Sequence, residues 1–493
     1  MLSIRRKTHY RLWLLALLLT SAPCFAHVGS PDVYFDGNAG PYRLLVTVRP
    51  PPMIPGLAQI EVRSESPDIR GLKAVPLYIV GEGSKYPPAP DQLQRSKDDP
   101  QFFTGQLWFM GSGSLQVRLE AEGPQGSGTV AVPVPAFAMR TLAMQRTLGW
   151  FLFAVMSVLV VAFISIIGAG SREGFLDPGQ KAGRTQSLRG VIVGGIAAAL
   201  LIAILFLGNA WWNAEASSRA LNTIYKPPAL SVDVSPNGHL TLSIGESLWH
   251  SRRSRTVMTA LIPDHGHLMH LFMIRVPQMD RFYHLHPWRT GETTFEEQLP
   301  AMPAGRYQIF ADIVRASGFP DTMVAGVDIP DLPGAPTDAA SDDSTALAPA
   351  LPAALQSSDT APLAGGGRMV WERDTTPIHA KRPIWFRFRV EDQAGKPVQD
   401  LEPYMGMAGH AEFVSFDRSV FAHVHPEGSV AMAALALANP SPEKPDAMAG
   451  MAHMSSEVSF PYGFPKPGDY RMFIQVKRAG QVQTGVFDVN VEP

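Results

Sequence analysis

The sequence predicts a mainly β protein with three antiparallel β-sandwich domains and one two-helix transmembrane hairpin. The prediction rests on three observations: alternating apolar and polar runs between proline- and glycine-rich turns, two long uncharged stretches, and a histidine pattern that occurs twice. A chain of 493 residues is too long for a single hydrophobic core, which also favours several domains.

Residues 1–26 have the features of a secretory signal peptide. A basic segment at 5–7 precedes an apolar run at 12–19, and Cys24-Phe25-Ala26 fits a small-residue cleavage site. Cleavage there would remove the only cysteine, so the mature chain would lack disulfides and thiolate ligands, as suits an oxidising compartment. His27 would become the N-terminus, where an amine beside an imidazole can chelate copper; the alternative is a histidine that follows the cleavage site by chance.

Residues 27–140 are predicted to form the first β-sandwich. Alternating runs such as 42–48 and 115–119 are separated by proline and glycine turns, a pattern typical of antiparallel sheets. The formal net charge of −2 and the lack of a basic stripe argue against nucleic acid as a partner.

Residues 146–212 are predicted to form the transmembrane hairpin. The stretches 148–167 and 191–212 carry no charge and are each long enough to cross a bilayer. Basic residues prevail in the loop 171–189, so the positive-inside rule places it in the cytoplasm and both flanking regions in the periplasm of a bacterial inner membrane. The spans lack ionisable residues, which favours an anchor over an ion pathway. The alternative, two buried helices of a soluble core, fits poorly with such uniformly apolar runs.

Two related β-sandwich units are predicted at 228–330 and 369–493. The segment between them, 331–368, is rich in Ala, Pro, Asp and Ser and is interpreted as a flexible linker. Internal repetition supports the relation, because Gly305–Phe310 matches Gly468–Phe473 and each opens an expected strand after a proline-rich turn.

Each unit contains a Gly-His pair followed by His-x-His-Pro. The candidate metal ligands are His267, His284 and His286 in the first unit, and His410, His423 and His425 in the second. Side chains alternate along a strand, so the two histidines of each His-x-His face the same way, beside a third from the upstream segment. Three imidazoles suit copper or zinc.

The residues around each pattern indicate which metal to expect. In the first unit His265 would share a strand face with His267, whereas His270 would fall on the opposite face. The second unit has methionines upstream and an insertion downstream, and its further candidate ligands are Met405, Met407, Met448, Met451, His453 and Met454. Thioethers bind Cu(I) far better than zinc, so methionine near histidine in a mature chain without cysteine favours copper.

These features also have purely structural interpretations. Histidines at strand ends can cap hairpins, paired methionines can fill a core, and the insertion can be a disordered loop. The sequence leaves open whether the two units hold separate sites or share one. It contains no nucleophile elbow, phosphate-binding loop or His-Glu-x-x-His, so no enzyme is predicted, and a copper redox enzyme is kept only as a third alternative.

The segment Pro403–His410, continued by His423–Pro426 and Pro467–Tyr470, resembles the bacterial YtkA-like and FixH-like group of exported domains. The resemblance is best over 401–493 and weaker in the first unit. It implies an immunoglobulin-like β-sandwich that binds or delivers metal outside the cytoplasm. The implied motif residues are His410, His423 and His425, with His267, His284 and His286 as their counterparts. The first unit has His265-Gly266-His267 where the second has Met-Gly-Met, which argues against identical metal preferences.

The leading hypothesis is a membrane-anchored periplasmic protein that binds copper for tolerance, scavenging or delivery to an envelope metalloprotein. Its partners would be the metal ion and the inner membrane. The alternative is a metal-free scaffold whose sandwiches dock other envelope proteins and whose histidines cap hairpins.

Overall fold

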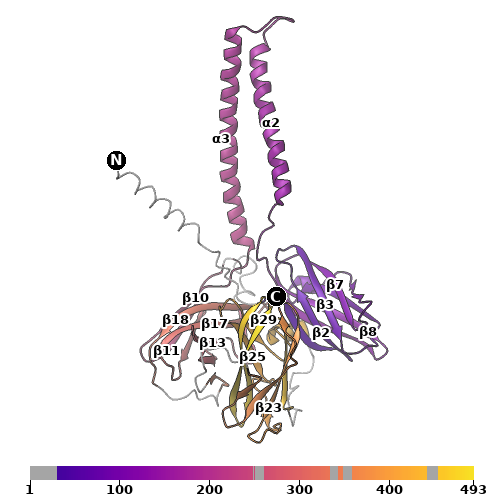
Figure 1. The fold of residues 1–493 in the computed structure, drawn as a ribbon, viewed down its shortest axis with the longest axis vertical. Coiled ribbons are helices and arrows are strands. Elements are labelled where there is room, and N and C mark those ends of the chain that lie inside the picture. Colours follow the sequence, from indigo (N-terminus) through magenta and orange to yellow (C-terminus); the bar gives the residue numbers. More distant parts are fainter. Residues whose placement is uncertain (1–29, 248, 250–259, 334–341, 348–357, 441–453) are drawn as a thin grey trace. The chain divides into compact units, whose positions relative to one another are not determined.

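The computed structural model describes residues 30–247, 249, 260–333, 342–347, 358–440 and 454–493. The described chain is mainly β, with many antiparallel strand pairs and two long apolar helices (Figure 1), as the sequence predicts. Two compact units divide the chain: the helices belong to 138–225, and the sheets belong to 1–137 together with 226–493. The expected signal peptide and His27 lie outside the described residues.

The N-terminal sheets share one hydrophobic core. One sheet has the order β1 (Val33–Ala39), β2 (Tyr42–Arg49), β3 (Gly56–Ser64), β7 (Phe102–Phe109), β6 (Gln94–Arg95). The other has the order β5 (Asp91–Gln92), β4 (Gly71–Tyr78), β8 (Gly113–Gly123), β9 (Gly126–Ala136), with the short helix η1 (Glu82–Ser84) after β4. Buried residues of both sheets, such as Val46 and Val117, belong to the same apolar cluster, so the two sheets pack face to face.

The helices α2 (Arg146–Glu173) and α3 (Arg184–Thr223) are long and apolar enough to cross a membrane. They lie side by side (Figure 1), and a Cβ atom at Gly190 would lie 2.9 Å from the carbonyl oxygen of Gly168, so small residues allow close packing. The expected loop 171–189 is shorter in the structure, because both helices continue into it. The expected loop contains arginine, glutamine and leucine, which are good helix formers. Polar side chains outside the apolar layer do not disfavour the helix.

We call 228–347 repeat 1 and 358–493 repeat 2. In repeat 1 one sheet has the order β10 (Leu230–Val234), β11 (His239–Ile244), β16 (Thr294–Gln298), β15 (Trp288–Arg289). The other has the order β12 (Leu261–Ile262), β17 (Gly305–Arg315), β13 (His270–Val276), β14 (Phe282–Leu285), β19 (Thr345–Ala346), and β18 (Pro320–Ile329) pairs with β17.

Repeat 2 follows the same plan. One sheet has the order β20 (Thr360–Pro362), β21 (Arg368–Glu372), β23 (Ile384–Glu391), β27 (Glu457–Tyr462). The other has the order β22 (Ile378–His379), β29 (Gln481–Glu492), β28 (Gly468–Arg478), β25 (His410–Ser415), β26 (Phe421–Val424); β24 (Leu401–Glu402) pairs with β28, and α6 (Met432–Ala438) follows β26. The hairpin β13–β14 of repeat 1 thus corresponds to β25–β26 of repeat 2, and β17 corresponds to β28.

The expected flexible linker 331–368 contains ordered strands. β19 pairs with β14, and β20 pairs with β21. Leu347 is buried in an apolar cluster shared by both repeats. The composition predicted a flexible linker. In the structure, pairing with the edge strand β14 and burial of Leu347 hold 342–347 in place.

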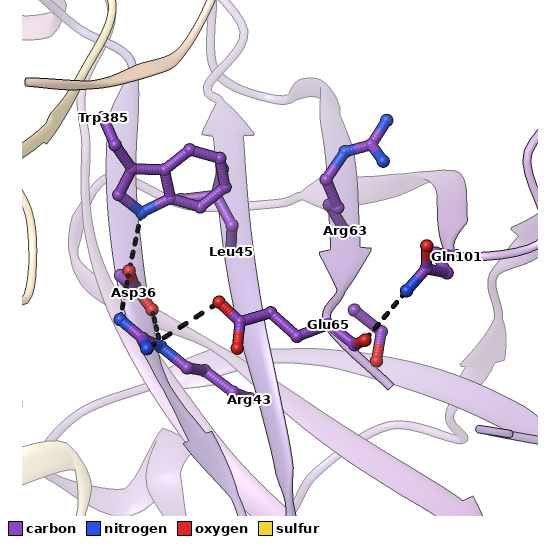
Figure 2. A pocket seen from close by; sticks show the side chains of 8 residues that line it. Asp36, Arg43, Leu45, Arg63, Glu65, Gln101 and Trp385 are labelled. Carbon is purple, nitrogen blue, oxygen red and sulfur yellow. Dashed lines mark hydrogen bonds and ion pairs between the residues drawn. The ribbon is translucent and has the colours of Figure 1, made fainter. Parts of the chain in front are cut away.

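The N-terminal domain contacts repeat 2 through Asp36. This carboxylate pairs with Arg43 at 2.9 Å and accepts a hydrogen bond from the Trp385 indole at 2.8 Å, beside a polar pocket (Figure 2). The backbone N–H of Asp36 also donates to the carbonyl oxygen of Glu427 at 2.8 Å. At Gly428, φ is 120° and a Cβ atom would lie 2.0 Å from the Tyr34 carbonyl oxygen, so the close approach requires glycine.

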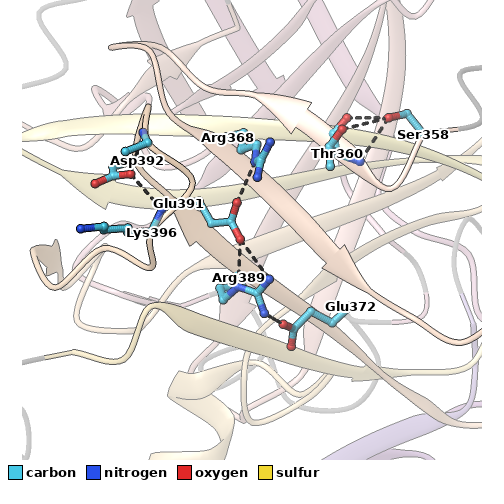
Figure 3. A network of polar contacts seen from close by, with 9 residues as sticks. Ser358, Thr360, Arg368, Glu372, Arg389, Glu391, Asp392 and Lys396 are labelled. Carbon is cyan, nitrogen blue, oxygen red and sulfur yellow. Dashed lines mark hydrogen bonds and ion pairs between the residues drawn. The ribbon is translucent and has the colours of Figure 1, made fainter.

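Ion pairs cross the sheet β20–β21–β23–β27 of repeat 2 (Figure 3). Glu391 accepts hydrogen bonds from Arg368 at 2.7 Å and from Arg389 at 3.0 Å, and Arg389 also pairs with Glu372. Arg368 and Glu391 are direct cross-strand neighbours, so the pair supports the register of β21 and β23. Partial exposure of both arginines limits its contribution to stability.

Candidate metal centre

The same tight turn precedes β13 in repeat 1 and β25 in repeat 2. Asp264 and His267 exchange two backbone hydrogen bonds, as Tyr404 and Met407 do. The central residues have positive φ in both copies: 51° at His265, 88° at Gly266, 49° at Met405 and 81° at Gly406. Two consecutive positive φ angles define a type I′ turn, which favours glycine at one of the two positions.

This shared turn corrects the alignment of the two histidine patterns. The sequence pairs His267 with His410, but the structure places His270 and His410 at the same point, the first residue of β13 and of β25. His267 therefore corresponds to Met407, and His265 to Met405. The expectation that His270 lies on the opposite face from the other ligands also fails, because His265 and His267 lie on a turn, where strand alternation does not apply.

Eight histidine rings form one continuous cluster between the two repeats. The cluster contains His265, His267, His270, His284, His286, His410, His423 and His425, linked by ring-centroid distances between 3.8 and 6.3 Å. All six predicted histidine ligands belong to it. The sequence patterns did not mark His265 and His270 as candidate ligands, although both lie beside the first motif.

The first triad combines both repeats. One ring nitrogen from each of His265, His410 and His425 lies within 4.8 Å of the others. His265 comes from the repeat 1 turn, whereas His410 opens β25 and His425 follows β26. The Nε2 atoms of His265 and His425 are 3.2 Å apart. Of the predicted set His410, His423 and His425, this triad contains His410 and His425, together with His265 from the other repeat.

The tautomers of His265 and His425 are fixed by backbone carbonyls. His265 Nδ1 lies 3.1 Å from the Met405 carbonyl oxygen, and His425 Nδ1 lies 3.1 Å from that of Val430. A carbonyl oxygen only accepts, so each Nδ1 carries the proton and each Nε2 of a neutral ring presents a lone pair. Two lone pairs 3.2 Å apart repel one another unless a cation lies between them.

The second triad is His270, His284 and His286, whose ring nitrogens also lie within 4.8 Å of one another. His270 Nε2 is 3.0 Å from the Asp264 carbonyl oxygen, so its Nδ1 is the free nitrogen, 3.1 Å from His284 Nε2. The expected third ligand, His267, instead stacks on His286 with centroids 3.8 Å apart.

The repeats exchange the groups that orient two of the histidines. Gln475, opposite His410 on β28, places Oε1 3.0 Å from His284 Nδ1 of repeat 1. Asp312, opposite His270 on β17, places Oδ2 3.5 Å from His423 Nδ1 of repeat 2. The arrangement is reciprocal, and it resembles the outer hydrogen bonds that orient metal-ligating imidazoles.

Aromatic packing beneath the histidines has the same reciprocal form. Phe282 of repeat 1 stacks on Phe473 of repeat 2, and Phe421 of repeat 2 stacks on Phe310 of repeat 1, both with centroids 4.3 Å apart. These rings belong to one apolar cluster drawn from both repeats. Packing of these aromatic rings therefore holds the two repeats together next to the histidine cluster.

Burial keeps the cluster neutral. Desolvation lowers the pKa of His265 and of His270 to about 4. It also lowers the pKa of the other six rings, and neighbouring imidazoles add to the effect for His284, His286, His410, His423 and His425. Neutral imidazoles are the metal-binding form, so protons compete weakly for these nitrogens near pH 7.

The carboxyl groups of Asp264, Asp312 and Glu412 lie near the imidazoles. Glu412 occupies the register position opposite His423, is fully buried, and has no hydrogen-bond partner at either oxygen. Burial raises the pKa of Glu412 well above its usual range and raises the pKa of Asp312 to about 6. One oxygen of Asp312, Oδ1, is likewise buried without a partner.

The segment 342–347 supplies further contacts that no sequence motif predicts. Ser344 Oγ lies 3.3 Å from His286 Nδ1. Asp343 pairs with Lys477 at 2.6 Å and accepts a hydrogen bond from the Met405 backbone N–H at 3.3 Å. Tyr404, in the place of Asp264, lies with its hydroxyl 3.1 Å from His284 Nδ1. No sequence motif identifies these residues, because their contacts arise only when distant segments of the chain fold together.

The predicted methionine ligands are placed differently from one another. Met405 forms part of the turn beside His265, and Met407 is buried at the end of that turn. Met454 is packed in the hydrophobic core of repeat 2 rather than in the histidine cluster. Met448, Met451 and His453 lie outside the described residues.

Comparison with known proteins gives one matching family model and a number of similar solved structures. A family model described as "Domain of unknown function (DUF8832)" matches residues 365–493. No curated protein matches the chain. Solved structures similar to it include Escherichia coli alpha-2-macroglobulin activated by porcine elastase (9% identity, TM-score 0.18, covering 94% of this chain and 31% of that one). An endo-fucoidan hydrolase from glycoside hydrolase family 107 has 8% identity and a TM-score of 0.15, with 90% and 43% covered.

A third similar structure is an ICAM-5 D1–D4 ectodomain fragment, with 8% identity, a TM-score of 0.15, and 89% of this chain and 73% of that one covered. The chain spans less than half the length of the first two structures. TM-scores this low carry no argument about fold or function.

Proposed function

We propose that this chain is a membrane-anchored periplasmic protein that binds copper between its two C-terminal repeats, for tolerance, scavenging or delivery. The observation that supports the proposal most directly is the 3.2 Å contact between His265 Nε2 and His425 Nε2. Two nitrogens bound to one tetrahedral ion at about 2.0 Å lie about 3.3 Å apart. The spacing therefore suits two ligands of one ion.

The ligand chemistry favours copper over zinc. Imidazole nitrogen suits both metals, but removal of the signal peptide would leave a chain without thiolates. Met407, at the end of the Tyr404–Met407 turn, offers a thioether in the position that His267 has in repeat 1. A soft thioether at the position equivalent to that of His267 favours Cu(I).

A metal-free scaffold explains the cluster less well. Histidines that cap hairpins would satisfy their nitrogens by hydrogen bonds. Here His286 Nε2, His423 Nε2 and both ring nitrogens of His410 are buried without hydrogen-bond partners. Each such nitrogen costs free energy unless a ligand occupies it. We therefore propose a carrier or binding protein, with neither a scaffold nor an enzymatic role.

The remaining parts of the proposal concern the fold and its location. The hydroxyls of Tyr307 and Tyr470, each two residues into its strand, donate to the carbonyl oxygens of Pro303 and Lys466 at 2.9 and 2.8 Å. A tyrosine that bonds back to the preceding turn is a feature of immunoglobulin-like sandwiches. The hairpin α2–α3 would anchor the chain, with its basic connecting loop in the cytoplasm and the sandwiches in the periplasm.

Metal retention by the full chain tests the proposal. The protein in detergent is loaded in parallel with Cu(I), Cu(II) and Zn(II), desalted, and analysed by mass spectrometry for metal content. We expect copper to be retained, with Cu(I) held in preference to Zn(II). In the variant Met407→Leu the preference for Cu(I) should fall while Cu(II) is still retained. A protein that retains no copper, or retains only zinc, would contradict the proposal.

A further inference from the structure

The two histidine triads are in direct contact with each other. His265 of the first triad lies 6.0 Å from His270 of the second, measured between ring centroids. His410 of the first lies 6.3 Å from His284 of the second. Each triad alone has the nitrogen spacing of a metal site. Two ions bound in triads whose rings touch would be close enough to influence one another.

His423 contacts members of both triads but belongs to neither. Its ring lies 4.5 Å from His425 and 5.4 Å from His410, and 5.5 Å from His270 and 5.9 Å from His284. Its side chain is only 7% exposed, and its Nε2 is buried without a partner. Asp312 lies near Nδ1 of His423. The nitrogen of His423 that is free to bind a metal ion is therefore Nε2, which lies between the two triads.

Buried carboxyl oxygens beside the cluster lack hydrogen-bond partners. Glu412 faces His423 across the strand pair, and neither of its buried oxygens has a hydrogen-bond partner. Asp312 Oδ1 is a third buried carboxyl oxygen without a hydrogen-bond partner. A buried polar atom without a hydrogen-bond partner is costly, and cations among the adjacent imidazoles would offset that cost.

We propose that the two triads form a single dinuclear copper centre, with His423 between the ions. This inference rests on the proposed copper-binding function and adds stoichiometry and ion–ion coupling to it. One ion lies among His265, His410 and His425, and is shared by both repeats. The other lies among His270, His284 and His286 of repeat 1, with Gln475 and Tyr404 of repeat 2 orienting His284.

Copper quantification combined with electron paramagnetic resonance tests the inference on the full chain in detergent, loaded with Cu(II). We expect about two copper ions per chain and a spectrum that shows coupling, with a half-field transition or an integrated intensity well below two spins. The variant His265→Ala should retain one copper with one full, uncoupled spin. The variant His286→Ala, in the other triad, should give the same change and guards against a folding defect particular to one position.

The outcomes separate this inference from the function on which it rests. Two retained coppers that give two full, uncoupled spins would overturn the dinuclear centre and leave copper binding intact. One retained copper in the unsubstituted protein would have the same meaning. Complete absence of retained copper, after loading with Cu(I) as well as with Cu(II), would overturn the proposed function itself, and the dinuclear centre with it.

Discussion

Replacing His265 with alanine is expected to weaken retention of one copper ion by at least about 100-fold, because loss of a direct ligand should exceed the 10–100-fold effect of outer-shell substitutions. His265 lies in repeat 1, whereas its two partner ligands, His410 and His425, lie in repeat 2. Replacing His425 of repeat 2 with alanine should therefore weaken copper retention to the same extent. The measurement is copper affinity by competition with a chelator of known affinity.

Two other histidines provide matched controls. His239 lies on β11 near Glu296, and His379 lies on β22 near the carbonyl oxygen of Pro493. Neither belongs to the cluster, so His239→Ala and His379→Ala should keep the affinity of the unsubstituted protein. Circular dichroism confirms that each variant is folded. Equal affinity in His265→Ala and in the controls would remove His265 from the site.

The metal-free protein is expected to lose stability as the pH falls from about 6.5 toward 4. Burial lowers the pKa of His265 and His270 to about 4. In that window the unfolded chain binds protons at these histidines and the folded chain does not, so the free energy of unfolding decreases as the pH falls. Each such histidine accounts for up to about 1.4 kcal/mol per pH unit.

Carboxyl groups near the cluster act in the opposite direction. Burial raises the pKa of Asp312 to about 6 and also raises the pKa of Glu412. Between the unfolded and folded pKa values the folded state binds the extra proton, so these groups add stability as the pH falls. Eight histidines have a lowered pKa, so the net effect should still be a loss.

Urea unfolding of the metal-free chain at pH 7 and at pH 5 measures this effect. The midpoint should be lower at pH 5, and His265→Ala should reduce the difference between the two pH values. Bound copper should raise the midpoint at both pH values, since an ion that binds only the folded state stabilises it. A midpoint that is equal or higher at pH 5 in the metal-free protein would contradict the account of buried neutral histidines.

The fold class could be predicted from the sequence because its signals are local. Alternating runs predicted β structure, and two uncharged stretches predicted the long helices, which the structure places at Arg146–Glu173 and Arg184–Thr223. The strand β19 and the other contacts of 342–347 could not be predicted from the sequence. The order of this segment depends on pairing with β14 and on the burial of Leu347, and neither is visible in an alanine- and proline-rich composition.

The candidate site could be predicted only by residue type. His-x-His-Pro located four of the eight histidines, because a strand fixes the relative direction of nearby side chains. The structure groups the histidines differently where a turn intervenes: the Asp264–His267 turn brings His265 close to His410 and His425 of repeat 2, and His270 lies close to His284 and His286. Reciprocal contacts such as His284 with Gln475 join residues far apart in the chain, and a single sequence contains no local signal for them.

X-ray diffraction from crystals of the copper-loaded full chain, with data collected on both sides of the copper absorption edge, tests the central claim most directly. The anomalous difference map locates copper without assumptions about its ligands. We predict a peak about 2.0 Å from ring nitrogens of His265, His410 and His425, which shows that both repeats bind one ion. Copper bound only outside the eight-histidine cluster, with the cluster nitrogens free of metal, would contradict the account.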